Sequence, residues 1–301
     1  MAVTLSAIDL SALPAPQVVQ QIDFETVLAA MLADLQARDP TFTALLESDP
    51  AYKILEVVAY RETLLRQQMN DASVGLMLAY AEGGDLDQIG VNYGVTRLTI
   101  TPANNTTIPP TAAVMETDSA FRARIQLSLE GYSSAGPSGA YLYFAKSASG
   151  DVLDASVTSP QPGTVLVTVL SQTGTGGAPQ ATLDAVSAAL NSTSVRPLCD
   201  TVQVQSASIV SYSIVATLTL ASTADQATVL ANAQAAAQAY ATARHKVGLP
   251  VYVVGVISAL MVTGVVDAVL AAPGITTDLA ITDLQASYCT GITLTFGAYG
   301  V

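Results

Sequence analysis

Residues 49–84 read DPAYKILEVVAYRETLLRQQMNDASVGLMLAYAEGG, and this stretch decides the N-terminal part of the fold. Asp49 followed by Pro50 is a typical helix start, because proline is favoured in the first helical turn. Apolar residues then recur at alternating steps of three and four, a heptad pattern interrupted by Glu62. The pattern stops at Gly83-Gly84, so we predict a helix of about 30 residues, some 45 Å long.

The apolar positions of this helix form a seam on one of its faces. A shorter helix predicted over residues 23–36 is apolar on one face and would cover only half of that length. We therefore expect the rest of the seam to meet a helix of another chain, although a hairpin within the chain remains the alternative. The seam residues are Leu55, Val58, Leu65, Met69, Ala72 and Leu76.

Helical and strand patterns alternate after residue 118. Thr164–Leu170 is apolar on both faces, which is typical of a central strand. Val210–Leu220 alternates apolar and mostly Ser/Thr residues, which predicts a half-buried strand. We therefore predict a multidomain α+β fold. Its parts are a helical domain with the long heptad helix at 1–98, a Pro/Thr/Asn-rich linker at 99–117, a middle α+β domain at 118–205 and a C-terminal α+β domain at 206–301.

Charge is scarce and unevenly distributed. The chain has 11 Lys and Arg against 24 Asp and Glu, a net charge of -13, which argues against nucleic-acid binding because phosphate contacts need cations. Residues 1–154 carry 26 of these 35 charged side chains, and residues 155–301 carry nine. A surface so poor in charge suggests burial in an assembly, with a Ser/Thr-coated free domain as the alternative.

The sequence carries only weak signals for membrane insertion, secretion or disulfide formation. Residues 247–266 carry no charge and are long enough for a membrane span, but glycines and Pro250 interrupt them. We interpret this segment as core elements, with membrane insertion as the alternative. The first 17 residues lack a signal-peptide pattern, so we expect folding in a cytoplasm. Cys199 and Cys289 stand far apart in sequence, so we expect reduced, buried thiols.

No pattern in the chain indicates catalysis. His245 is the only histidine and lies in a basic triplet at a predicted helix end, where such side chains favour the helix carbonyls. Carboxylates at 85–87 and at Glu116 and Asp118 lie near helix starts, where negative charge is stabilised. We expect no catalytic, cofactor or metal site and no enzyme activity. Glycan hydrolysis by distant, converging carboxylates remains an alternative.

Several long segments carry a family resemblance that extends over nearly the whole chain. They are LPAPQVVQQIDFE (13–25), LESDPAYKILEVVAYRE (46–62), VGLMLAYAEGGDLDQIGVNYGVTRLTITPA (74–103), TIPPTAAVMETDSAFRARIQLSLEG (107–131), VTSPQPGTVLVTVLS (157–171), VRPLCDTVQVQSA (195–207) and QASYC (285–289). Together they resemble the baseplate J family of contractile-tailed temperate bacteriophages.

The resemblance implies a structural, non-enzymatic protein of the virion tail, assembled in the cytoplasm of the host bacterium. Such proteins occur as two copies per baseplate wedge. Their N-terminal helices bundle with another wedge protein, and their C-terminal domains join copies into an inner ring around the hub. The ring is thought to couple host recognition to sheath contraction.

The partners that the resemblance implies are other copies of the chain, other wedge and hub proteins, and the baseplate protein that initiates the sheath. We expect no nucleic acid, membrane or cofactor among them. An equivalent component of a tailocin or a contractile secretion system is the alternative. Neighbouring genes would distinguish these machines, because capsid and terminase genes accompany only a phage.

Overall fold

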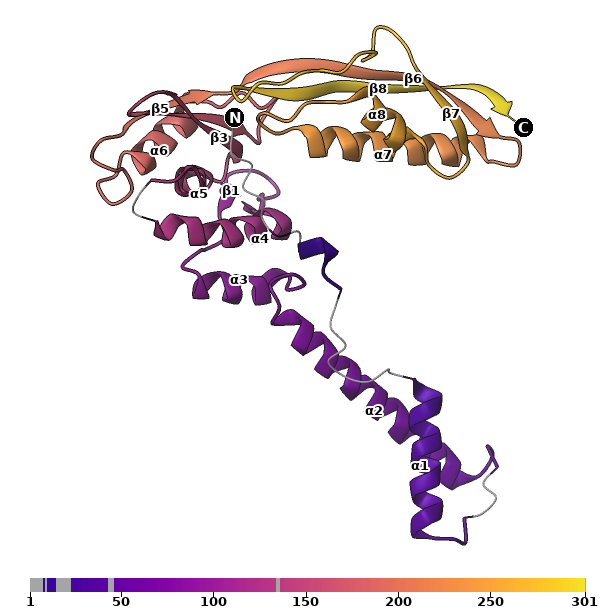
Figure 1. The fold of residues 1–301 in the computed structure, drawn as a ribbon. Helices are drawn as coiled ribbons and strands as arrows, with labels where there is room; N and C mark the ends of the chain where they lie inside the picture. Colours follow the sequence, from indigo (N-terminus) through magenta and orange to yellow (C-terminus); the bar gives the residue numbers. More distant parts are fainter. Residues whose placement is uncertain (1–7, 9, 15–22, 43–45, 134–135, 301) are drawn as a thin grey trace. The chain divides into compact units, whose positions relative to one another are not determined.

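The structure is a computed structural model that describes residues 8, 10–14, 23–42, 46–133 and 136–300. Its contacts divide the chain into two compact units, with the division between Thr96 and Arg97 (Figure 1). The described part of the first unit is helical and the second unit combines helices with small sheets, so the predicted α+β class is confirmed. Most of residues 1–22, which bear on the signal-peptide expectation and on the resemblance of residues 13–25, lie outside the described residues.

The first unit is built on α1 (Phe24–Arg38) and α2 (Pro50–Gly75), after a short 3₁₀ helix at Leu10–Ala12. The Asp23 carboxylate caps α1 by accepting a hydrogen bond from the Thr26 N–H at 3.1 Å. Val27 and Leu28 of α1 pack on Ala59, and all three are buried. Because these contacts involve the first half of α2, α1 leaves the second half uncovered.

α2 ends at Gly75, about two turns before the predicted end at Gly83. The prediction that Leu76 belongs to the helix is therefore wrong, because residues 76–80 form turns before α3 (Gly83–Asn92) begins. Glycine is a weak helix former. Asp85 also occupies the space beside residue 75, where an added Cβ would lie 2.9 Å from its Oδ2 atom. The resulting helix of 26 residues is about 39 Å long.

The second unit begins with the segment expected to be a linker. β1 (Thr99–Thr101) pairs antiparallel with β2 (Val114–Met115), and α4 (Asp118–Leu127) follows, then a 3₁₀ helix at Ser128–Tyr132. The Thr117 hydroxyl accepts a hydrogen bond from the Ala120 N–H and so caps α4. The domain limits inside this unit stay predictions.

A three-stranded sheet comes next, with the order β3-β4-β5. Its strands are β3 (Val152–Gln161), β4 (Thr164–Ser171) and β5 (Thr201–Ser206), and its helices are α5 (Ser138–Ala148) and α6 (Gln180–Leu190). β4 is the central strand, as its apolar residues on both faces predict. Val167 and Val169 of β4 pack with Tyr141 of α5 and with Val186 and Leu190 of α6.

A second three-stranded sheet has the order β7-β6-β8. Its elements are β6 (Ser208–Ala221), α7 (Gln226–Arg244), α8 (Val253–Leu260), β7 (Val265–Leu270) and β8 (Gln285–Gly300). Ile214, Leu218 and Leu220 alternate along β6 and are fully buried, in accord with the predicted half-buried strand. α7 and α8 lie along one face of this sheet (Figure 1), where they supply Ala233, Val256 and other core residues.

The two sheets are joined through one nearly continuous strand, because only Ala207 separates β5 from β6. The Ala207 N–H donates to Val169 in the first sheet at 2.8 Å, and the Ser208 N–H donates to Leu284 beside the second at 3.0 Å. Asp154 of β3 also accepts a hydrogen bond from the Val247 N–H. The boundary predicted at 205/206 falls at this junction.

The apolar segment 247–266 forms part of this core, as we interpreted it. It contains α8, an isolated bridge between Val251 and Leu279, and the start of β7. Among the described residues, no helix combines the length and apolar character needed to cross a membrane. Both cysteines are free thiols, but the expectation that both are buried is wrong. Cys199 is exposed in a loop and Cys289 is half-buried.

Candidate interaction surface

The predicted seam of α2 divides into a covered and an uncovered part. Leu55 is partly buried and packs in the cluster formed with α1. The other seam residues face solvent, and Leu76 lies beyond the helix. The exposed members are Val58 (46%), Leu65 (56%), Met69 (60%), Ala72 and Leu76 (81%).

Further large apolar side chains are exposed beside them on the same helix. Ile54 is 64% exposed, Val57 62% and Leu64 38%. At 3.6 residues per turn, these residues and the exposed seam residues within α2 share an arc of about 140°. The resulting surface is named the apolar stripe. It consists of Ile54, Val57, Val58, Leu64, Leu65 and Met69.

The heptad seam contains only half of this stripe. Ile54, Val57 and Leu64 lie at steps of three and seven along the neighbouring row. A search for every position at i, i+3, i+4 and i+7 would have found them. What that search could not show is that α1 packs on Leu55 and Ala59, which leaves the stripe uncovered.

A helix that faces water normally carries polar residues on its outer face. Here six large apolar side chains stand together on one face of α2 without a cover in the described part of the chain. Contiguous exposed apolar surface of this kind marks sites of protein contact. The polar interruption at Glu62 is engaged within the helix, where Arg66 donates from Nε to its Oε1 atom at 2.9 Å. The stripe is therefore the candidate functional site.

The contacts of His245 stabilise the fold. It is the C-cap residue of α7, as its position at a predicted helix end implies. Its ring does not bind the helix carbonyls, because Nδ1 lies 2.6 Å from the Ser287 carbonyl oxygen in β8. The ring also contacts the edge of Tyr288, with centroids 5.5 Å apart. His245 thus ties the end of α7 to β8.

The carboxylates near the start of α4 are held by arginines. Glu116 is 7% exposed, and its Oε2 atom lies 2.6 Å from the Arg124 guanidinium. Asp118 pairs with Arg97 at 2.7 Å. Both carboxylates therefore stabilise this corner of the fold. Within the part of the chain that the structure describes, no group of three or more His, Cys, Asp or Glu side chains could hold a metal ion.

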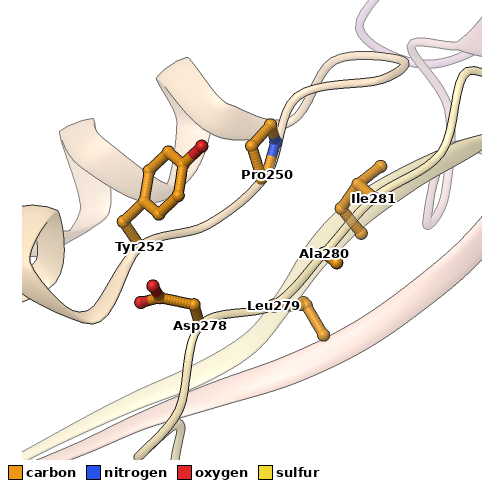
Figure 2. A pocket seen from close by; sticks show the side chains of 6 residues that line it. All are labelled: Pro250, Tyr252, Asp278, Leu279, Ala280 and Ile281. Atoms are coloured by element: carbon orange, nitrogen blue, oxygen red, sulfur yellow. The ribbon is translucent and has the colours of Figure 1, made fainter.

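A small surface pocket lies between the start of α8 and the segment before β8 (Figure 2). Tyr252 and Pro250 line one side, and residues 278–281 line the other. Its charged group, Asp278, accepts a hydrogen bond from the Val253 N–H at 2.8 Å. The carboxylate therefore stabilises the first turn of α8, and the other lining residues are Pro250, Tyr252, Leu279, Ala280 and Ile281.

Comparisons with known proteins identify the family of the chain. Residues 47–104 match the model of the baseplate J-like N-terminal domain, and residues 133–206 match that of the baseplate J-like central domain. The first match includes all of the apolar stripe. The chain is also 48% identical over 290 residues to the baseplate protein J of Escherichia phage P2, covering 94% of this chain and 95% of that protein. The chain therefore belongs to the baseplate J-like family of phage proteins.

Proposed function

We propose that this chain is a wedge component of a contractile tail baseplate and that its apolar stripe packs on a helix of another baseplate protein. The observation that carries the proposal is the exposure of the stripe on a helix whose other face is covered by α1. Family membership supports a structural role in a phage baseplate. The stripe supports the further step, because no described residue of this chain covers it and contact with another chain would remove this apolar surface from water.

The same proposal assigns the charge-poor part of the chain to contacts between copies. Residues 226–243 of α7 carry no charged side chain, although many of them are exposed. Copies with a net charge of -13 repel one another, so uncharged faces are where they can meet at the lowest electrostatic cost. In the proposed assembly, two copies join each wedge and form the inner ring around the hub.

The mechanism we propose is geometric. Interfaces between packed elements have discrete alternative arrangements, and an assembly of them can switch when one contact changes. Host recognition would bias the ring toward the arrangement that releases the sheath, through contacts with the hub and with the baseplate protein that initiates the sheath. No bond is made or broken in this step.

The test is a double substitution in the stripe, Leu65→Asp with Met69→Asp. The full chain is co-expressed with the neighbouring tail proteins, and complexes are sized by light scattering on a sizing column. The wild-type chain is expected in a complex that contains two copies of it. The variant is expected to lose this complex, because docking would bury two carboxylates among apolar side chains.

The matched control is Gln67→Glu with Asn70→Asp, which adds the same charge to the same two turns outside the stripe. The control is expected to assemble like the wild type. Leu65 and Met69 are more than half exposed, so the substitutions are expected to leave the fold intact. Circular dichroism of both variants checks this expectation. Unchanged assembly of the Leu65/Met69 variant would refute the proposed role of the stripe.

A further inference from the structure

One charged residue lies within the apolar stripe. Arg61 is exposed, and at 100° per residue it lies near the middle of the arc. Val57 and Leu64 flank it on one side, and Val58 and Leu65 flank it on the other. A helix that covers the stripe therefore also covers the Arg61 guanidinium.

Arg61 differs from the other cations of α2. Lys53 pairs with Glu56 at 2.9 Å, and Arg66 pairs with Glu62. Among the described residues, no carboxylate lies within ion-pair distance of Arg61. Because Arg61 is exposed, covering the stripe would remove its guanidinium from water.

Covering an unpaired guanidinium with apolar surface is unfavourable, since a buried charge needs a partner of opposite sign. The remaining exposed residues of the arc, Gln68 and Ala72 among them, offer no negative charge. The carboxylate must therefore come from the docked helix. A bidentate pair with the planar guanidinium would also set the register of the two helices.

We propose that the occupant of the stripe is an amphipathic helix of a different chain, with apolar heptad positions and a Glu or Asp that pairs with Arg61. This inference rests on the proposed function and adds the chemistry of the partner. A second copy fits this site poorly, because stripe-to-stripe packing would bring two Arg61 side chains together. The carboxylate nearest the stripe, that of Glu62 at its edge, is already paired with Arg66. Arg61 thus selects for a different chain and against self-pairing.

The experiment uses two synthetic helical peptides with the same leucine heptad seam. One peptide carries Glu at the positions that flank the seam, and the other carries Lys. Binding of each fluorescein-labelled peptide to the full chain is measured by anisotropy at physiological salt. The Glu peptide is expected to bind at least about tenfold more tightly than the Lys peptide. This preference would oppose the net charge of -13, which by itself attracts the Lys peptide.

The decisive variant is Arg61→Glu, which is expected to reverse the preference. Arg and Glu have similar helix propensities, and position 61 is exposed, so the fold is expected to persist. The control is Arg38→Glu on α1, which removes an exposed cation outside the stripe and is expected to keep the preference for the Glu peptide.

Three results would overturn the inference: equal binding of the two peptides, binding of neither, or an unchanged preference in Arg61→Glu. The inference and the proposed function can fail separately. Loss of assembly in the Leu65/Met69 variant together with no charge preference would retain the stripe as an interface and reject the acidic partner. Unchanged assembly in that variant would reject the interface itself.

Discussion

Replacing Arg124 with methionine would remove the charge partner of a buried carboxylate while keeping a long apolar side chain. Glu116 and Arg124 side chains are 8% and 5% exposed. Arg124 donates from Nε to Oε1 at 3.0 Å and from its terminal nitrogen to Oε2 at 2.6 Å. In the variant, Glu116 keeps the hydrogen bond from the Leu98 N–H but loses both bonds from the guanidinium.

The size of the effect follows from this burial. Breaking a buried ion pair by removing one partner costs about 3–5 kcal/mol, because the remaining charge stays out of water. For a unit of this size, each kcal/mol lowers the melting temperature by about 2–4 °C. Arg124→Met is therefore expected to lower the melting temperature of the unit that begins at Arg97 by roughly 6–20 °C.

Differential scanning calorimetry of the full chain measures this shift. The double variant Glu116→Leu with Arg124→Met removes both charges and is expected to recover much of the loss, since neither charge is then stranded. Arg38→Met is the exposed control. Its pair with Asp34 has side chains 76% and 64% exposed, so its loss is expected to leave the melting temperature nearly unchanged. A shift below about 2 °C in Arg124→Met, or no recovery in the double variant, would contradict the reasoning.

Three further predictions concern the second unit. The Tyr212 hydroxyl is buried with no hydrogen-bond partner among the described residues. Tyr212→Phe is therefore expected to leave the free energy of unfolding unchanged or to raise it by about 1 kcal/mol. A clear loss of stability in urea unfolding would be evidence against this. Burial also raises the pKa of Tyr212, and burial with the hydrogen bond to Asp200 raises the pKa of Tyr141. The stability from these raised pKa values is fully present below about pH 10 and lost as the pH rises further. An alkaline absorbance titration should therefore show late ionisation of Tyr141 and Tyr212, and the contribution of Tyr212 should be missing in Tyr212→Phe. Finally, β5 continues into β6, so native-state hydrogen exchange should show that both sheets lose protection together; separate openings of residues 118–205 and 206–301 would contradict this coupling.

Much of the local structure was predictable because its causes lie close together in the chain. The run Val165–Leu170 is apolar on both faces, so it could only be a covered, central strand, and β4 is central. Asp23 reaches the N–H of Thr26 three residues ahead, so α1 begins where its cap predicts. The full length of β8 is not evident from local pattern, because its pairing with β6 joins residues more than 70 positions apart.

The candidate site was predicted in part. The heptad spacing identified Val58, Leu65 and Met69, which are exposed on α2. It also included Leu55, which packs with the α1 cluster, and Leu76, which lies beyond the helix end. The first outcome depends on which face α1 covers, which is not a local property. The second has a partly local cause in Gly75, a weak helix former that also lies close to Asp85.

The sequence by itself determined the α+β class, the start of the long helix at Pro50, the absence of catalytic patterns and the family resemblance. These properties depend on composition, on the spacing of nearby residues and on the sequences of long segments, all of which can be read from the chain without its tertiary structure. Only the tertiary structure decided which apolar side chains of α2 are covered, and so revealed a stripe with Arg61 near its middle. The physical reason is that burial is a property of pairs of elements, and a helix alone does not determine which of its apolar faces a neighbour will cover.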